Sequence, residues 1–176
     1  LFMNDGLRWL KFSNRNLTDN DIHAVWGTSA TNIIAVCSYG TILTSNGTSW
    51  NLLTPSITTL DLFCVWGSST ENVYVGGYPG KLLHYNGLAW ETVSLGTSQT
   101  LKSLWGSSAS DIYATGSEGT IIHYDGSTWS TVDTIGGVAL NALWGSAYND
   151  VFAAGEAGTI YHYDGNVWNK LVPPAS

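Results

Sequence analysis

The nine tryptophans of this chain fall into two series of nearly constant spacing, and no tryptophan is left over. In the first series each tryptophan precedes a glycine, and the members stand 40, 39 and 39 residues apart: Trp26, Trp66, Trp105 and Trp144. The second series has spacings of 41, 40, 39 and 39 residues: Trp9, Trp50, Trp90, Trp129 and Trp168. A fixed period of this length indicates one supersecondary unit used several times.

Each unit divides into four short segments rich in β-branched and aromatic residues, separated by Gly- and Ser-rich stretches. In the unit LKSLWGSSASDIYATGSEGTIIHYDGSTWSTV we expect strands at 101–105, 111–115, 120–124 and 127–132. The Asp125-Gly126 pair suits a two-residue type I′ turn, which needs two positive φ angles. That turn predicts three cross-strand pairs: Tyr124 with Ser127, His123 with Thr128, and Ile122 with Trp129.

Both faces of this hairpin carry bulky side chains, so both faces have to be covered. Ile122, Tyr124 and Trp129 share one face, whereas Ile121 and His123 lie on the other. Four-stranded sheets of about 40 residues that cover one another describe a β-propeller. The 3.6-residue periodicity of a helical solenoid is absent from the sequence. The predicted fold is therefore all-β, a propeller of four-stranded antiparallel blades.

The number of units is not an integer. The segment LFMNDGLRWLKFS at 1–13 aligns with LLHYNGLAWETVS at 82–94, so 1–20 is expected to be a half blade with only a third and a fourth strand. Four complete blades follow, at 21–60, 61–100, 101–138 and 139–176. We expect either a ring completed by another copy or by a longer parent chain, or a five-position ring with one incomplete blade.

The repeats resemble those of a known group. WGSSASDIYATGSEGTIIHYDGSTW, WGSAYNDVFAAGEAGTIYHYDGNVW and WGSSTENVYVGGYPGKLLHYNGLAW are similar to repeats of bacterial secreted or surface β-propellers, grouped loosely with BNR/Asp-box, kelch-like and photosystem II assembly factor-like propellers. The resemblance implies the propeller architecture and a binding role toward varied partners. Asp125 and Gly126 are adjacent, whereas the Asp-box has the form S-x-D-x-G-x-T-W, so the resemblance implies no sialidase activity.

Charge excludes two classes of partner. Six Lys and Arg against 13 Asp and Glu give a net charge of −7, which disfavours nucleic acid and anionic lipid surfaces. No apolar run is long enough for a membrane-spanning helix. Charged residues make up 11% of the chain, and low charge with few lysines favours an extracellular or cell-surface location.

Histidine and aspartate recur at fixed positions of the unit. His84, His123 and His162 occupy one position of the third strand, and a histidine on each separate sheet favours structural hydrogen bonding over a shared metal or catalytic centre. Asp111 and Asp150, like Asn32 and Asn72, open the second strand, where an Asx-type bond to the amides of the turn is expected rather than calcium binding.

No catalytic motif, cofactor motif or metal-ligand spacing is present. The chain has no G-x-S-x-G, P-loop or dinucleotide signature and no Cys-x-x-Cys, so no enzyme activity, cofactor or metal is expected. Cys37 and Cys64 each replace a small residue of the unit, which leaves open either two buried thiols or a bond between neighbouring blades.

The aromatic residues divide into repeated and unrepeated sets. The repeated tryptophans are expected to pack between blades, because that contact has to recur around a ring. Tyr39, Tyr78 and Tyr148 are loop aromatics that do not recur in every unit, so they are the candidate ligand-binding residues. The function that follows is a non-catalytic binding or scaffold propeller for a protein or glycan. Two alternatives are a lectin-like carbohydrate-binding propeller and a fragment of a propeller glycoside hydrolase.

Overall fold

The computed structural model describes residues 2–4, 9–11, 17–54 and 56–171 and confirms the all-β propeller architecture. Each of the four complete blades is an antiparallel meander of four strands. Blade 1 consists of β3 (Ile22–Ser29), β4 (Asn32–Cys37), β5 (Ile42–Ser45) and β6 (Trp50–Leu52). Blade 2 consists of β7 (Leu62–Ser69), β8 (Asn72–Gly77), β9 (Lys81–Tyr85) and β10 (Trp90–Val93).

Blades 3 and 4 repeat the same arrangement. Blade 3 consists of β11 (Leu101–Ser108), β12 (Asp111–Gly116), β13 (Thr120–Tyr124) and β14 (Trp129–Thr134). Blade 4 consists of β15 (Leu140–Ala147), β16 (Asp150–Gly155), β17 (Ile160–Tyr163) and β18 (Trp168–Leu171). The first strand of each blade is longer than expected, because it continues past its tryptophan through an irregularity in the pairing, as between Gly106 and Ser108.

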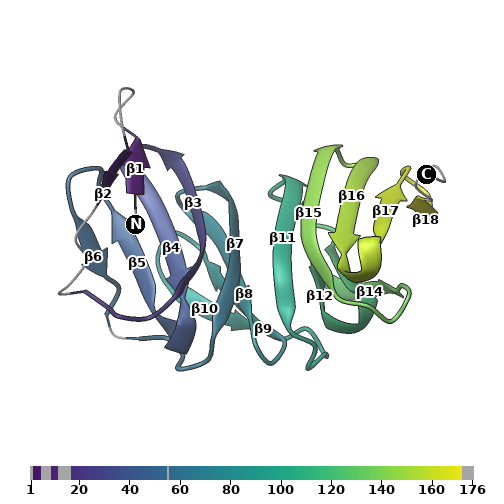
Figure 1. Cartoon of the computed structure of the whole chain (residues 1–176), viewed down its shortest axis with the longest axis horizontal. Helices are drawn as coiled ribbons and strands as arrows, with labels where there is room; N and C mark the ends of the chain where they lie inside the picture. Colours follow the sequence, from purple (N-terminus) through teal and green to yellow (C-terminus); the bar gives the residue numbers. More distant parts are fainter. Residues whose placement is uncertain (1, 5–8, 12–16, 55, 172–176) are drawn as a thin grey trace.

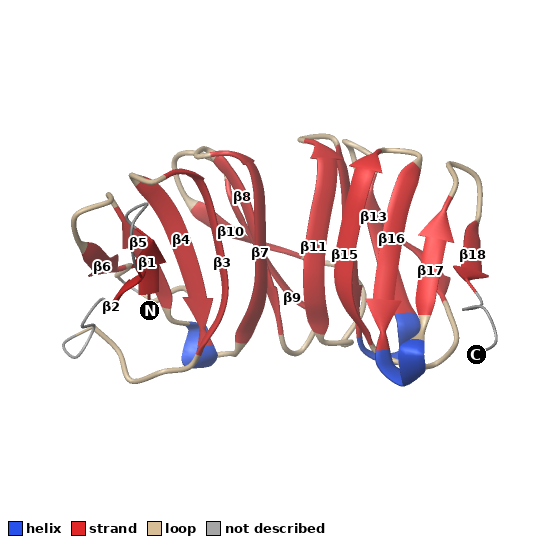
Figure 2. Ribbon diagram, turned by 45° about the horizontal axis from the view of Figure 1, so that its top comes forward, coloured by secondary structure: helices blue, strands red, loops and turns tan. Residues whose placement is uncertain are grey.

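The four sheets stand side by side in a row (Figures 1 and 2), and the first strands of consecutive blades are in contact. The first and the last described strands lie at opposite ends of this row (Figure 1). Before blade 1, β1 (Phe2–Asn4) pairs with β2 (Trp9–Lys11) in a two-stranded antiparallel sheet, at the place of the expected half blade. The Asp5-Gly6 turn and the side chain of Trp9 lie outside the described residues.

The predicted register of the outer hairpin is wrong by two residues. Tyr124 lies opposite Trp129, not Ser127, and the N–H of Asp125 donates to the carbonyl of Thr128 across 3.2 Å, so Gly126 and Ser127 form the tip. The cause is the Asp125 carboxylate, whose Oδ1 accepts the backbone N–H groups of Ser127 and Thr128, each at 2.8 Å. Within this turn only Gly126 has a positive φ, at +92°.

A shift of two residues keeps every side chain on its predicted face, because side chains alternate with a period of two. The new register brings the rings of Tyr124 and Trp129 into a stack with centroids 5.2 Å apart. Asn46, Asn86 and Asp164 bind the equivalent turn amides in the other blades. The same turn is thus built four times.

Adjacent blades are joined by two kinds of tryptophan contact. The first-strand tryptophans of blades 1 to 3 cover the glycine of the following blade, and the position of a Cβ on Gly145 would lie only 2.6 Å from the indole of Trp105. The fourth-strand tryptophans of blades 3 and 4 meet an aromatic ring of the preceding blade, as Trp129 meets Tyr74 at 5.6 Å. Buried aliphatic side chains such as Leu101 and Ile112 fill the space between these contacts.

Candidate functional site

A pair of stacked rings fills the junction between most neighbouring blades. On the second strand of blades 2, 3 and 4 an aromatic residue stacks on the histidine of the third strand, with centroid separations of 4.2, 4.3 and 4.3 Å: Tyr74 on His84, Tyr113 on His123, and Phe152 on His162. Tyr74 and Tyr113 also reach the following blade, where they contact Trp129 at 5.6 Å and Trp168 at 5.9 Å. The junctions after blades 2 and 3 are therefore filled by aromatic rings.

Blade 1 lacks this pair. Ile34 and Thr44 lie opposite each other at the equivalent positions of β4 and β5, and neither side chain carries a ring. The junction between blades 1 and 2 consequently contains a hollow of about 530 Å³, and Ile34, which is 8% exposed, is one of the residues that line it. The hollow is the space that the tyrosine and histidine occupy in the other junctions.

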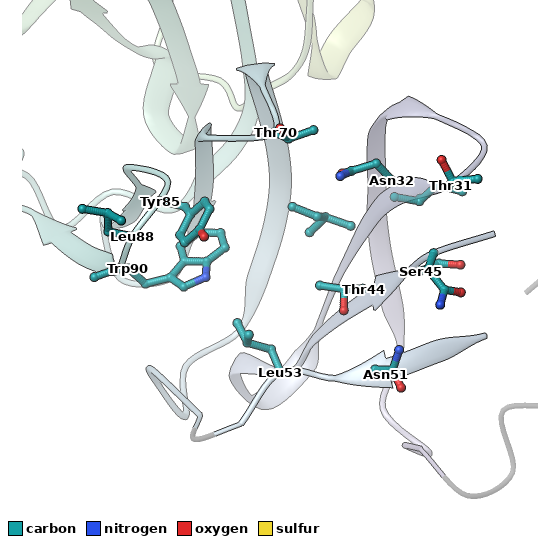
Figure 3. Close-up of a pocket in the computed structure, with 14 residues that line it drawn as sticks. Thr31, Asn32, Thr44, Ser45, Asn51, Leu53, Thr70, Tyr85, Leu88 and Trp90 are labelled. Atoms are coloured by element: carbon teal, nitrogen blue, oxygen red, sulfur yellow. The ribbon is translucent and has the colours of Figure 1, made fainter. Parts of the chain in front are cut away.

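The two walls of the hollow differ in chemistry (Figure 3). Blade 2 supplies Tyr85 and Trp90, whose ring centroids lie 5.3 Å apart, so that both rings are on the same wall. Blade 1 supplies the facing wall, which combines polar residues (Thr31, Asn32, Thr44, Ser45, Asn46 and Asn51) with apolar ones (Ile33, Ile34 and Leu53), and Thr70, Leu88 and Ala89 of blade 2 complete the described lining. An amide offers both donors and acceptors, and a hydroxyl can act as either.

None of the described residues that line this hollow is charged, although the whole chain carries a net charge of −7. In blade 2 the Oδ1 atom of Asn72 lies 2.6 Å from Nε2 of His84. Blade 1 has Thr44 in place of this histidine, so the equivalent Asn32 has no imidazole to bind and can face a ligand. A hollow that combines two aromatic rings, aliphatic side chains and neutral hydrogen-bonding residues suits a ligand that has both apolar and hydroxyl-bearing surfaces. This site was not predicted from the sequence, although Ile34 and Thr44 stand where the other three blades have an aromatic residue and a histidine.

The recurring aspartates do not bind the turn amides, contrary to expectation. Asp111 lies between two side chains: its Oδ1 is 2.6 Å from Nε2 of His123, and its Oδ2 accepts the hydroxyl of Ser107. The backbone N–H of Ser110 in this turn donates instead to the hydroxyl of Ser108, at 3.2 Å. Because the carboxylate stands between the hydroxyl and the imidazole, the histidine is not placed to take a proton from the serine.

Blade 4 builds the same group from Ser146, Asp150 and His162, with 2.7 Å between the imidazole and the carboxylate. The hydroxyl of Ser146 is the main cause of a lowered pKa for Asp150, and His162 adds to it. In blade 2 the histidine meets an amide, and burial lowers the pKa of His84 below its ordinary value. Of the described residues, no three His, Cys, Asp or Glu side chains gather where they could hold a metal ion.

The three tyrosines selected from the sequence are exposed and do not form one site. Tyr39 and Tyr78, 70% and 54% exposed, lie in the connections between the second and third strands of blades 1 and 2. Tyr148 lies in the turn between β15 and β16, at the opposite end of the blades. None of the three lines the hollow.

The two cysteines are free thiols, so the alternative of a bond between neighbouring blades is not realised. The reason is their location: Cys37 packs with Leu43 and Trp50 on one side of blade 1, whereas Cys64 faces blade 3 from blade 2. The remaining histidine, His23, lies 2.8 Å from the hydroxyl of Ser38. Across the described strands and turns there is no helix of the length and hydropathy needed to span a bilayer.

Comparison with known proteins gives likenesses of structure only. No protein-family model and no curated protein matches the sequence. The chain is similar in structure to YCF48 bound to a D1 peptide, with a TM-score of 0.71 and 16% identity over 90% of this chain and 55% of that one. It is also similar to an ancestral GH74 enzyme, with a TM-score of 0.68 and 16% identity over 89% of this chain and 26% of the other.

These structural similarities show a shared propeller fold, and sequence identities of 16% show nothing about activity. The chain spans about half the length of the first structure and about a quarter of the second. It therefore corresponds to part of each of these larger structures.

Proposed function

We propose that this protein is a non-catalytic binding module, at the cell surface or outside the cell, and that it holds an uncharged carbohydrate in the hollow between blades 1 and 2. The observation that supports this most is the hollow itself, which exists because Ile34 and Thr44 replace a ring pair and leave the Trp90 side of the junction open. Its volume of about 530 Å³ lies within the range of small-ligand sites.

Carbohydrates match both walls of the hollow. The C–H face of a pyranose ring is apolar and stacks on aromatic rings such as that of Trp90, while its hydroxyls exchange hydrogen bonds with amides such as those of Asn32 and Asn51. The described lining residues are all uncharged, which favours neutral sugars over sialylated or sulfated ones.

The test is a glycan array that carries neutral, sialylated and sulfated oligosaccharides, probed with the wild-type chain and with two variants. The double variant Ile34→Tyr/Thr44→His refills the hollow with the pair found in blades 2 and 3, and Trp90→Ala removes the stacking surface. We expect binding to neutral glycans that falls at least about tenfold in both variants. Tyr148→Ala is the matched control, because that exposed tyrosine is remote from the hollow.

Two results would overturn this proposal. One is the absence of binding to any neutral glycan. The other is binding that persists in the refilled variant but is lost in Tyr39→Ala, Tyr78→Ala or Tyr148→Ala, which would place the ligand on the loops.

The non-catalytic part of the proposal is supported by the lining of the hollow, in which no described residue carries a carboxylate. Glycoside hydrolysis uses two carboxyl groups that flank the scissile bond. The alternative of a hydrolase fragment requires these groups to come from outside this chain. We expect no release of nitrophenol from neutral nitrophenyl glycosides, and turnover that survives purification would contradict this.

A protein ligand is the second candidate, and the peptide bound to the structurally similar YCF48 favours it. Extended peptides also combine apolar side chains with neutral hydrogen-bonding groups. A peptide array probed with the same refilled variant separates the two candidates: peptide binding that disappears in this variant, without glycan binding, favours the protein ligand.

A further inference from the structure

The same contact joins the inner strands at each of the three internal junctions. The indoles of Trp26, Trp66 and Trp105 lie over Gly67, Gly106 and Gly145 of the following blade, within 2.6–2.7 Å of where a Cβ would stand. We call this the Trp-on-Gly contact. Only glycine fits beneath the indole, so the contact pairs a projecting ring with a matching gap.

The fourth tryptophan of the first series has no such glycine beneath it among the described residues. Trp144 is 60% exposed. Ile160 on the same face is 39% exposed, whereas its counterparts Leu82 and Ile121 are 0% exposed. The face of blade 4 that would meet a following blade is therefore open.

One matching gap is left at the other end of the row, on blade 1. Among the described residues no tryptophan covers Gly27, whose nearest neighbours are Asn32 and Ile33 of its own blade. A hollow of about 350 Å³ lies there, lined by Val25 and Trp26 among others. Val25 is 57% exposed, whereas Leu104, its counterpart in blade 3, is 7% exposed. We call this hollow the Gly27 pocket.

Only the inner part of this face of blade 1 is open. On its outer strands Ala35 and Leu43 are fully buried, and Leu17 packs against their cluster. The chain N-terminal to blade 1 thus covers the outer part of the face and leaves the Gly27 pocket accessible. The Gly27 pocket thus lies where, at the three internal junctions, the first-strand tryptophan of the preceding blade packs on the glycine.

We propose that Trp144 of one copy of this chain inserts into the Gly27 pocket of a second copy, so that the protein associates head-to-tail through a fourth Trp-on-Gly contact. Each copy carries one half of the contact at each end, and the contact would continue the series that already joins blades 1 to 4. Two copies that use both ends form a closed pair, and further copies extend a ring. This association is independent of the carbohydrate hollow, which opens between blades 1 and 2.

Sedimentation velocity on the purified chain, from about 1 to about 100 µM, tests the proposal. The wild type is expected to sediment at a multiple of 18.9 kDa, with dissociation on dilution. Trp144→Ala removes the projecting ring and Val25→Arg obstructs the pocket. Both residues are exposed, so circular dichroism should show intact blades in both variants. Each variant alone is expected to associate at least about tenfold more weakly than the wild type.

Mixing the two variants distinguishes head-to-tail from face-to-face association. Trp144→Ala retains an intact pocket and Val25→Arg retains an intact tryptophan, so an equimolar mixture should recover a dimer with one good junction. Tyr148→Ala, an exposed aromatic outside both halves of the contact, is the control and should behave as the wild type. A wild type that remains a monomer at every concentration would overturn the proposal. Val25→Arg that associates like the wild type would overturn it too, because two Trp144 faces would then be packing on each other.

Discussion

Replacing one isoleucine at a time at a single position of the repeat measures how much each blade junction contributes to stability. Ile42, Ile121 and Ile160 occupy the same place on the third strand of blades 1, 3 and 4, and they are 2%, 0% and 39% exposed. The same substitution by alanine removes the same three carbon atoms in each case. The difference in the free energy of unfolding between the variants therefore measures how much the burial of this side chain by the following blade contributes to stability.

The expected losses follow from the buried area. Three carbon atoms at about 0.8 kcal/mol each give about 2.4 kcal/mol of lost burial. The cavity left in a closed junction raises the cost of Ile42→Ala and Ile121→Ala to about 3–4 kcal/mol. Ile160 is already 39% exposed and its space opens to solvent, so Ile160→Ala is expected to cost about 1.5 kcal/mol.

Urea unfolding followed by tryptophan fluorescence and by circular dichroism gives these free energies of unfolding. The protein is held near 1 µM so that association does not cover the end of blade 4. Equal losses in Ile121→Ala and Ile160→Ala would refute the reasoning, because the end face of blade 4 would then be as well covered as an internal junction.

Further outcomes follow from individual contacts. Trp129→Ala is expected to lower the free energy of unfolding by about 3 kcal/mol and the melting temperature with it, and an unchanged melting temperature would contradict its packing role. Burial lowers the pKa of His84 below 6.5, so the stability that this residue contributes is present above pH 6.5 and is lost as the pH falls toward the lowered pKa. Imidazole NMR should show its midpoint below 6.5 in the folded chain. Hydrogen bonds within its turn, from the backbone N–H of Thr128 first, hold the pKa of Asp125 well below 3.8. The stability that this carboxylate contributes is therefore present above about pH 4 and is lost in acid, and Asp125→Asn should show a smaller loss of melting temperature between pH 5 and pH 3. Burial raises the pKa of the two cysteine thiols to about 11 and about 12, so a thiol reagent at pH 8 should label neither in the folded protein and both in urea.

The sequence was sufficient to predict the architecture, because the two tryptophan series recur in every unit. It was not sufficient for the register of the outer hairpin. The Asp125-Gly126 dipeptide is compatible with a type I′ turn, but the Asp125 side chain takes the amides of the two residues after Gly126 and moves the tip by one position. A local side-chain bond of this kind competes with the backbone preference and is not apparent from the dipeptide alone.

The carbohydrate hollow shows a different limit. Thr44 departs visibly from the histidine of the other units, but the consequence depends on Trp90, which is 46 residues further along the chain and on another sheet. Only the packing of blade 1 against blade 2 shows that the missing ring leaves that wall uncovered. Departures from a repeat are visible in sequence, whereas the space that they create belongs to the junction between two repeats.

The Trp-on-Gly contact also bears on how such a protein can change its size. In the Trp-Gly dipeptides of blades 2 and 3 the tryptophan contacts the following blade, whereas the glycine contacts the preceding one. Every unit therefore carries the same glycine on one face and the same tryptophan on the other. Blades 2 and 3 need no further residues to form this contact with their neighbours. Deleting or duplicating one whole unit of 39 or 40 residues, from one Trp-Gly dipeptide to the next, brings together two halves of a contact that already fit. Gene duplication or protein engineering can thus alter the number of blades while this one contact between the first strands is kept.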